Sequence, residues 1–274
     1  MKRKILIFAV IFFPAVFVIF SALFYIKYNK APSLEPRQAV FMVEKGKSAG
    51  AIARELETRH IIREKWPFLL AHRLFFRSKT IKAGEYAFEL PLSPKAVLEK
   101  ITEGKITLHP ITIPEGLTKR ETAGHFFSML FIDISDFLAA SENTGLISDV
   151  DPDAINLEGY LFPETYHFPK NTPVKKIIEA MVLQFRSVFN EEWSSRAEEL
   201  GMTVRDVVIL ASLIEKETSK PEERELISAV FHNRLRIRMK LDCDPTIIYA
   251  LKEEEGFNGN LRKKDLKLDS PYNT

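Results

Sequence analysis

Glu215 is the residue whose type and position in this sequence best suit chemistry. A capping box formed by Thr203 and Asp206 predicts a helix over residues 203–218, with Glu215 near its end. At about 100° per residue, four small or apolar side chains lie within about 60° of Glu215: Val204, Val208, Ala211 and Ser212. The pattern predicts that Glu215 lies on an inward-facing stripe, whereas Glu217, about 160° away, is predicted to face solvent.

An inward-facing carboxyl group near the end of a helix has the properties of a general acid. Burial disfavours the charged form of a carboxyl group, and the carbonyl groups that point out of the last helical turn disfavour it further. A carboxylic acid that keeps its proton near neutral pH can donate that proton to a leaving group. The alternative is an ion pair between Glu215 and an arginine, for which Arg224 and Arg234 are the candidates. Helical periodicity alone leaves both interpretations open.

Three polar residues further along the chain are candidate substrate contacts. Asp244 and Thr246 lie at the break between two predicted helices, and we predict that they line a cleft opposite Glu215. The alternative for Asp244 is that it caps a helix whose first residue is Pro245. Asn233 is predicted to bind an acetamido group, or else to cap a turn.

Several other kinds of chemistry find no support in the sequence. The 6 histidines show no HxxxH or HxH spacing, and Cys243 lies between two aspartates that disfavour a thiolate. Walker, GxGxxG and GxSxG motifs do not occur. The net charge is only +2, and the basic stretch from Arg234 to Lys240 is predicted to be a solvated helix face. We therefore predict no metal, no cofactor and no nucleic-acid partner.

The N-terminal residues have the composition of a membrane anchor. Residues 5–26 carry no charge, and as a helix they span about 33 Å, enough to cross a hydrocarbon core of roughly 30 Å. A cleaved signal peptide is the alternative, but its apolar region is usually about 7–15 residues long and ends in a cleavage site of small residues. We predict a retained single-pass helix, with residues 1–4 as a cytoplasmic stub and the rest of the chain outside the cytoplasm.

The chain after the anchor predicts an α+β fold that begins with a small module. A linker at residues 27–37 contains two prolines, and the α/β module is predicted at residues 38–105. Strands are predicted at residues 40–43 and 84–90. Helices are predicted to begin near three residues: Ser48, Trp66 and Ser93.

A mainly helical mixed domain is predicted for residues 106–274. It begins with a strand predicted at residues 106–113, and a capping box of Thr118 and Glu121 predicts the start of the next helix. An aromatic-rich loop is predicted at residues 156–169, between helical segments.

Five segments give the chain a resemblance to a known family. The segments are LASLIEKET at 210–218, VFHNRL at 230–235, LDCDPTIIYAL at 241–251, SPYNT at 270–274 and NLEGYLFPETY at 156–166. They resemble the signatures of the YceG-like (MltG) endolytic murein transglycosylases of bacteria. The module at residues 38–105 is similar to the LysM-like domain of that family, and the N-terminal anchor is a feature that the family shares.

The resemblance implies a reaction and a place for it. The family's catalytic glutamate is the first Glu of its EKET motif, which corresponds to Glu215. The implied enzyme cleaves the MurNAc–GlcNAc bond within a nascent glycan strand, leaves a 1,6-anhydro-MurNAc end and so terminates strand elongation. It implies a location at the cytoplasmic (inner) membrane, with peptidoglycan strands as substrate and cell-wall synthases as partners. Glu158, in the second signature loop, becomes a further candidate substrate contact.

Two other functions remain open at the level of sequence. A hydrolytic muramidase would need a second carboxylate to activate water, for which Asp244, Glu158 and Glu164 are candidates. A membrane-anchored protein that binds peptidoglycan without cleaving it would need only the LysM-like module. The family continues beyond the point that corresponds to Thr274, so the resemblance implies that this sequence is a fragment, and Cys243 replaces a small polar residue of the family.

Overall fold

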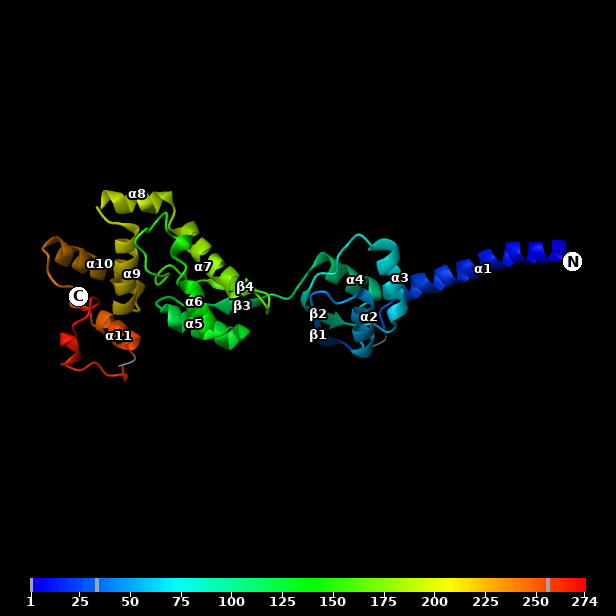
Figure 1. Ribbon diagram of the computed structural model, residues 1–274, viewed down its shortest axis with the longest axis horizontal. Coiled ribbons are helices and arrows are strands. Elements are labelled where there is room, and N and C mark those ends of the chain that lie inside the picture. The colour runs from blue at the N-terminus through cyan, green and yellow to red at the C-terminus, as the bar shows by residue number, and fades with distance from the viewer. Residues whose placement is uncertain (1, 33–34, 255–256) are drawn as a thin grey trace. The chain divides into compact units, whose positions relative to one another are not determined.

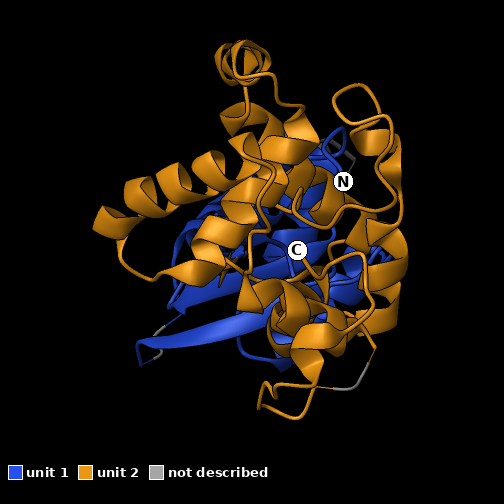
Figure 2. Cartoon of the chain, turned by 90° about the vertical axis from the view of Figure 1, so that its left-hand side faces the viewer, with its two compact units in different colours: residues 1–109, 167–171 blue, residues 110–166, 172–274 orange. Residues whose placement is uncertain are grey.

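The structure is a computed structural model that describes residues 2–32, 35–254 and 257–274 (Figure 1). Met1 of the predicted stub and residues 33–34 of the predicted linker therefore lie outside the described residues. The chain divides into two compact units, residues 1–109 with 167–171 and residues 110–166 with 172–274 (Figure 2). The first unit mixes strands and helices and the second is mainly helical, so the predicted α+β class is confirmed.

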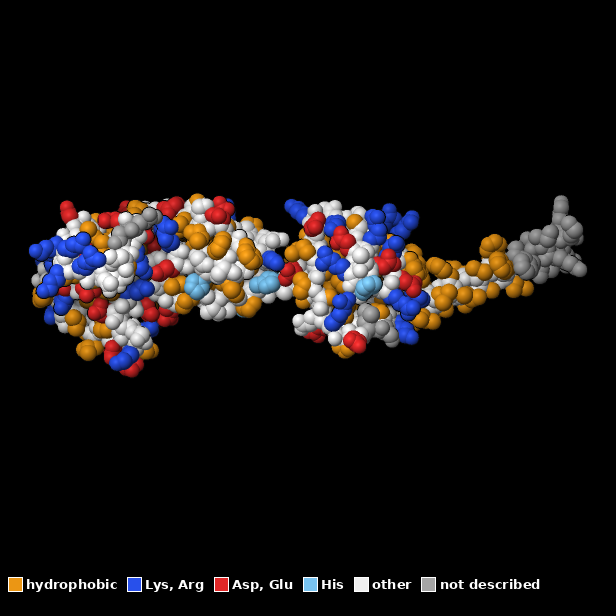
Figure 3. Space-filling view, turned by 90° about the horizontal axis from the view of Figure 1, so that it is seen from below, with side chains coloured by type: hydrophobic (Ala, Val, Ile, Leu, Met, Phe, Trp, Pro, Cys, Tyr) orange, Lys and Arg blue, Asp and Glu red, His pale blue; other side chains and the backbone are white. Residues whose placement is uncertain are grey.

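Helix α1 (Lys2–Asn29) is continuous through Pro14, and its stretch Val10–Asn29 is long and apolar enough to cross a membrane, with a mean hydropathy of 2.2. Its apolar side chains cover the described surface of the helix (Figure 3). The end of α1 belongs to the first unit, because Tyr28 is buried in that unit's core and Lys27 forms an ion pair with Glu64. The helix is compatible with a single-pass anchor that continues directly into a folded unit.

The core of the first unit forms between a two-stranded sheet and three helices. Strand β1 (Arg37–Val43) pairs antiparallel with β2 (Gly84–Leu90), and Phe41 lies opposite Tyr86. Three helices complete the unit: α2 (Ala49–Thr58), α3 (Lys65–Phe75) and α4 (Pro94–Glu103). The fully buried side chains include Phe41, Tyr86, Phe88, Ile52, Leu56 and Phe68. Ser48 and Ser93 cap α2 and α4 as predicted, and the predicted bounds of β2 are confirmed.

The second unit is built from helices around a short ladder. Strands β3 (His109–Thr112) and β4 (Thr165–Phe168) pair with each other, and residues 110–112 and 165–166 of this ladder belong to the second unit. Its helices, in chain order, are α5 (Lys119–Leu130), α6 (Ile134–Ser141), η1 (Thr144–Leu146), α7 (Val174–Val188), α8 (Glu191–Glu199), α9 (Val204–Glu217), α10 (Pro221–Arg236), α11 (Asp244–Glu253) and η2 (Asp265–Lys267). Phe126 of α5 stacks on Phe137 of α6, which packs these two helices together.

The strand predicted at residues 106–113 is shorter than expected. Only His109–Thr112 form a strand, because the residues before it bond to the edge of β2 through single contacts rather than a ladder. The backbone N–H of Thr107 donates to the carbonyl of Glu85 at 2.7 Å, and the Thr107 hydroxyl accepts from the N–H of Ala87 at 2.9 Å. A side chain thus replaces a backbone partner in this segment.

Candidate functional site

Helix α9 carries the candidate acid, and both of its ends are fixed by side-chain hydrogen bonds. At its start, the Thr203 hydroxyl accepts from Asp206 N at 3.1 Å and the Asp206 carboxylate accepts from Thr203 N at 2.9 Å, so the predicted capping box is confirmed. At its end, the buried Thr218 hydroxyl donates to Glu223 at 2.8 Å and accepts from Lys220 N at 3.0 Å. These bonds join α9 to α10 and hold the last turn of α9 in place.

The buried face of α9 differs from the predicted stripe. Leu210 and Leu213 are buried, against Phe231 and Cys243, whereas Ala211 and Ser212 are exposed. The prediction that these two small residues face inward is therefore wrong. Helical periodicity shows which residues share a face, but not which face meets the rest of the fold. Val204 and Val208 are half-buried, and Glu217 is exposed as predicted.

Glu215 lies partly buried against a basic side chain and a tight turn. Its side chain is 29% exposed, and its Oε2 lies 2.9 Å from Nη2 of Arg224. The same Nη2 lies 3.3 Å from Oε2 of Glu115, so one guanidinium group bridges two carboxylates. The ion pair that the sequence offered as an alternative for Glu215 is thus formed, with Arg224, while Arg234 instead contacts Asp242 and the carbonyl of Leu241.

The turn beside Glu215 depends on Gly116. This residue has φ +74°, which favours glycine, and a Cβ there would lie 3.4 Å from Cγ of Glu215. Within the described residues, Nε of Arg224 is buried without a hydrogen-bond partner. The Glu115–Gly116 turn therefore packs closely on the end of α9, and the guanidinium group between them is not fully satisfied.

The loop that contains Glu158 packs on the middle of α9. A Cβ on Gly159, which has φ +83°, would lie only 2.7 Å from Cγ1 of Val208. Glu158 accepts hydrogen bonds from the first backbone N–H of α5, that of Lys119, at 2.9 Å and from the Tyr249 hydroxyl at 3.3 Å. Glu158 thus connects its loop to α5 and α11.

The environment of Glu158 disfavours its charge. Burial raises the pKa of this carboxyl group above its usual value, and the hydrogen bonds from Lys119 and Tyr249 offset only part of that effect. Because the folded state holds this proton more tightly than the unfolded state does, the residue costs stability as the pH rises through the ordinary glutamate range towards the raised pKa.

Replacing Glu158 with Gln is therefore expected to raise the free energy of unfolding at pH 7, because the neutral amide can still accept from Lys119 N without a buried charge. The gain should disappear near pH ~4, where the carboxyl group is protonated in both states. Urea titrations at both pH values measure this difference. Glu164→Gln, an exposed residue of the same segment, is the matched control and should change nothing.

The other predicted contacts lie in different settings. Asp244 is exposed and is the first residue of α11, while Cys243 is the N-cap, so the helix begins one residue earlier than the capping alternative predicted. Thr246 is buried, and its hydroxyl donates to the carbonyl of Cys243 at 2.7 Å. Burial, helped by Glu217, raises the pKa of the Cys243 thiol to about 12, so it stays protonated.

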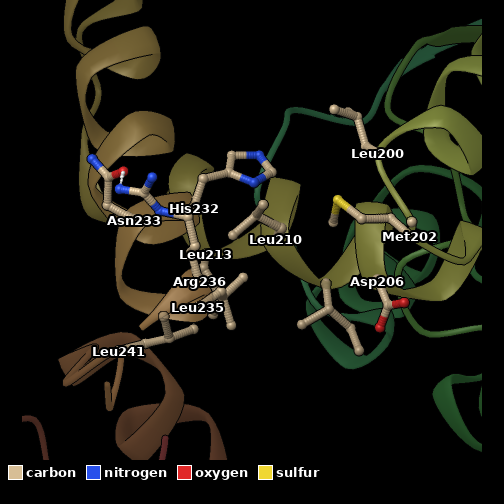
Figure 4. A pocket seen from close by; sticks show the side chains of 12 residues that line it. Leu200, Met202, Asp206, Leu210, Leu213, His232, Asn233, Leu235, Arg236 and Leu241 are labelled. Atoms are coloured by element: carbon tan, nitrogen blue, oxygen red, sulfur yellow. Dashed lines mark hydrogen bonds between the residues drawn. The ribbon is translucent and has the colours of Figure 1, made fainter. Parts of the chain in front are cut away.

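Asn233 is exposed on α10, where it lines a groove together with side chains of α9 (Figure 4). Glu215 is not among the residues that line this groove. Four residues that shape the surroundings of Glu215 and Glu158 were not predicted: Glu115, Gly116, Lys119 and Tyr249. The Pro-Glu-Gly turn directly before the predicted capping box was the one local signal for the first two. Within the described ranges, no group of three or more His, Cys, Asp or Glu is placed to hold a metal ion.

Comparison with known proteins decides the family. The profile of the YceG-like family matches residues 41–274. The chain belongs to the YceG-like family. The matched range contains all five signature segments, the second unit, and the first unit from residue 41 onward.

Two relatives of this chain carry the same name. The endolytic murein transglycosylase of Bacillus subtilis (strain 168) is 29% identical over 248 residues, which cover 85% of this chain and 68% of that protein. The endolytic murein transglycosylase of Streptococcus pneumoniae (serotype 2, strain D39) is 31% identical over 224 residues, which cover 70% of this chain but only 40% of that protein. A crystal structure of a YceG-like protein from Listeria monocytogenes superposes with a TM-score of 0.55 at 27% identity and covers 86% of this chain and 82% of that one.

Proposed function

We propose that this chain belongs to a membrane-anchored lytic transglycosylase that cleaves murein glycan strands. The observation that carries the proposal is the position of Glu215: a partly buried carboxylate at the end of α9, in a chain that belongs to the YceG-like family. The names of the Bacillus and Streptococcus relatives support murein as the substrate. The bond between MurNAc and GlcNAc is the proposed point of cleavage.

The proposed mechanism uses one carboxyl group twice. Protonated Glu215 gives its proton to the oxygen that leaves with GlcNAc, and the bond between that oxygen and C1 of MurNAc breaks. The C6 hydroxyl of the same MurNAc then closes on C1 and returns its proton to the Glu215 carboxylate. The products are a 1,6-anhydro-MurNAc end and a GlcNAc with a free 4-hydroxyl group. No water is consumed, so a second carboxylate is not required.

Arg224 must move aside for this mechanism to run. A carboxyl group that donates its proton to a sugar oxygen cannot at that moment be paired with the guanidinium group 2.9 Å away. Glu115 already lies 3.3 Å from the same Nη2, so Arg224 keeps an anionic partner when it releases Glu215. We infer that substrate opens the Glu215 pair while Glu215 takes up a proton from solvent, and that the pair closes again after product has left and the carboxyl group has released that proton.

The four predicted sugar contacts divide into two pairs. Asn233 and Asp244 are exposed, and we propose them as contacts to the strand. The Glu158 carboxylate already accepts hydrogen bonds from Lys119 N and the Tyr249 hydroxyl. The Thr246 hydroxyl already donates to the carbonyl of Cys243. We therefore propose that Glu158 and Thr246 position the loop and helix α11 rather than touch sugar.

The first unit and the anchor receive supporting roles in the proposal. Residues 38–105 follow the order strand, helix, helix, strand, helix, and we propose that they form a LysM-like module that holds glycan. We further propose that α1 anchors the chain in the cytoplasmic membrane, with both units on the outer side and with cell-wall synthases as neighbours. Sedimentation of the chain with purified sacculi, with and without residues 38–105, measures the proposed glycan binding.

The products of cleavage test the proposed reaction. Mass spectrometry of fragments released from sacculi by a protein that includes this chain should show 1,6-anhydro-MurNAc ends, which are lighter than reducing ends by one water. A muramidase in which Asp244, Glu158 or Glu164 activates water would release reducing MurNAc ends instead. Reducing ends alone, or no soluble fragments from an otherwise folded protein, would rule out the proposal.

A further inference from the structure

The first unit carries a surface that the proposed reaction does not use, at the end where α1 joins it. Helix α1 packs against α3 there, and the ring of Trp66 lies 5.9 Å from that of Phe20 and 6.1 Å from that of Phe24, centre to centre. At the other end of α3, the ring of Phe75 lies 6.4 Å from that of Phe24. Phe20 and Phe24 belong to the last two turns of the uncharged stretch 5–26. Both ends of α3 therefore contact the part of α1 that would lie at one face of a bilayer.

The junction between α1 and the first unit is held by packing and by polar contacts. Helix α1 runs without a break to Asn29, and its Tyr28 is buried in the core of the unit. The Glu64 carboxylate pairs with Lys27 of α1 and accepts from Nε1 of Trp66 at 2.7 Å. A membrane that holds α1 therefore also sets the position of α3.

Large apolar side chains at this junction are not covered by the rest of the protein. Four of them are at least half exposed, Leu23 and Ile26 of α1 and Leu74 and Phe75 of α3. Neighbouring apolar side chains that remain exposed mark a surface that binds a membrane or another partner. Trp66 beside them keeps a polar partner for its indole N–H, which is the arrangement typical of tryptophan at a membrane–water interface.

Basic side chains accompany this apolar surface. Residues 63–79 contain 5 Lys or Arg and a single Glu, whereas the whole chain has nearly equal numbers of basic and acidic residues, 39 and 37. That Glu is already in an ion pair with α1. Arg63, Arg73 and Arg77 are exposed and have no carboxylate within ion-pair distance in the described parts of the chain. Figure 3 shows Lys and Arg side chains gathered on the first unit beside the apolar helix. The charge of this end of the unit therefore favours an anionic partner.

We propose that residues 63–79, which include α3, form a face that binds the anionic phospholipid headgroups of the bilayer that α1 crosses. Helix α1 brings Trp66 and Phe75 to the edge of the hydrocarbon, where the neighbouring arginines meet lipid phosphate groups. A lipid surface is favoured over an acidic protein because the exposed apolar surface of α1 continues directly from this face. The inference rests on the proposed membrane anchor, but it concerns other residues and does not depend on the chemistry of Glu215.

The quenching of Trp66 by labelled lipids tests the proposal. The whole chain, with Trp193→Phe so that Trp66 is the one remaining tryptophan, is reconstituted into vesicles of phosphatidylcholine alone and of phosphatidylcholine mixed with phosphatidylglycerol. Both vesicles contain the same amount of a lipid with a doxyl quencher close to its headgroup. Quenching of Trp66 should be at least about twofold stronger in the vesicles that contain phosphatidylglycerol, because the anionic headgroups draw the basic face onto the membrane surface.

Charge reversal on the face provides the second arm of the experiment. Arg73→Glu combined with Arg77→Glu should remove the gain in quenching, because the anionic surface then repels the face. Both arginines are exposed, so the fold should survive, and an unchanged thermal unfolding curve in detergent verifies this. Lys175→Glu combined with Lys176→Glu, at two exposed residues of α7 in the second unit, is the matched control with the same change of charge and should keep the gain.

Retention of the chain on vesicles during an alkaline carbonate wash measures the anchor separately. A retained chain whose Trp66 is quenched equally in both lipid mixtures, or as strongly after the two arginine substitutions, would overturn the lipid-binding face and leave the anchor intact. A chain that washes off would overturn the anchor and the lipid-binding face with it. Release of anhydro-MurNAc ends tests Glu215 and has no bearing on either result.

Discussion

Glu215→Gln is expected to lower the release of anhydro-MurNAc ends from sacculi by at least about a hundredfold, in a protein that includes this chain. The amide keeps the size of the side chain but has no proton to give to the leaving oxygen and cannot take one back from the C6 hydroxyl. Both steps of the proposed mechanism use this one group, so the loss should appear in kcat rather than in KM. Quantification of anhydro ends by mass spectrometry provides the measurement.

Glu217→Gln is the matched control for this experiment. Glu217 lies two residues further along α9, is exposed, and carries the same charge, so its replacement should leave release within about twofold of the unaltered protein. Arg224→Gln adds a second comparison, because it removes the guanidinium group at 2.9 Å but leaves Glu215 in place. Release that persists in Glu215→Gln at more than a tenth of the original rate would exclude Glu215 as the acid.

Local features of the fold follow from the sequence because their partners are close along the chain. The capping boxes at the starts of α5 and α9 each join residues three apart, and both form as predicted. The alternation of residues 84–90 predicts β2 with the observed bounds, because each side chain's face is set by its neighbours. The uncharged N-terminal run likewise predicts a long apolar helix, although α1 extends beyond it to Asn29.

The environment of the candidate acid does not follow from the sequence, because its partners are distant. Arg224 bridges Glu215 and Glu115. Glu115 lies 109 residues before Arg224 along the chain, and no spacing rule selects Arg224 over Arg234. Tyr249 reaches Glu158 across 91 residues. The periodicity of α9 placed Ala211 with Glu215 correctly on one face, but that face is not the one on which the helix is buried.

Asp151→Ala is expected to destabilise the second unit by about 2–3 kcal/mol at pH 7. Asp151 is 6% exposed and accepts from the Tyr160 hydroxyl at 2.6 Å and from Nε of Arg205 at 3.0 Å. These bonds tie the start of α9 to the loop that carries Glu158. The alanine variant leaves the buried Tyr160 hydroxyl without its acceptor, whereas the partly exposed Arg205 regains water, so the cost falls short of that for a fully buried pair.

The pH dependence of this loss follows from the charge of Asp151. Burial by itself raises the pKa of this carboxyl group, but the hydrogen bonds from Arg205 and Tyr160 outweigh it and hold the pKa below its usual value. A lowered pKa of Asp151 stabilises the fold at pH values above the ordinary aspartate pKa. This contribution is lost as the pH falls through the pKa of the folded state. The difference in unfolding free energy between Asp151→Ala and the parent should therefore shrink in acid.

Urea unfolding followed by tryptophan fluorescence measures the loss of stability. The chain has 2 tryptophans, Trp66 in the first unit and Trp193 in the second. In a Trp66→Phe background the fluorescence therefore reports on the second unit alone. Asp149→Ala is the matched control. Asp149 lies two residues before Asp151, and its exposed carboxylate pairs with Arg186. Its removal should lower the free energy of unfolding by less than about 1 kcal/mol. Equal losses in the two variants would mean that the contacts of Asp151 with Tyr160 and Arg205 do not hold the Glu158 loop against α9.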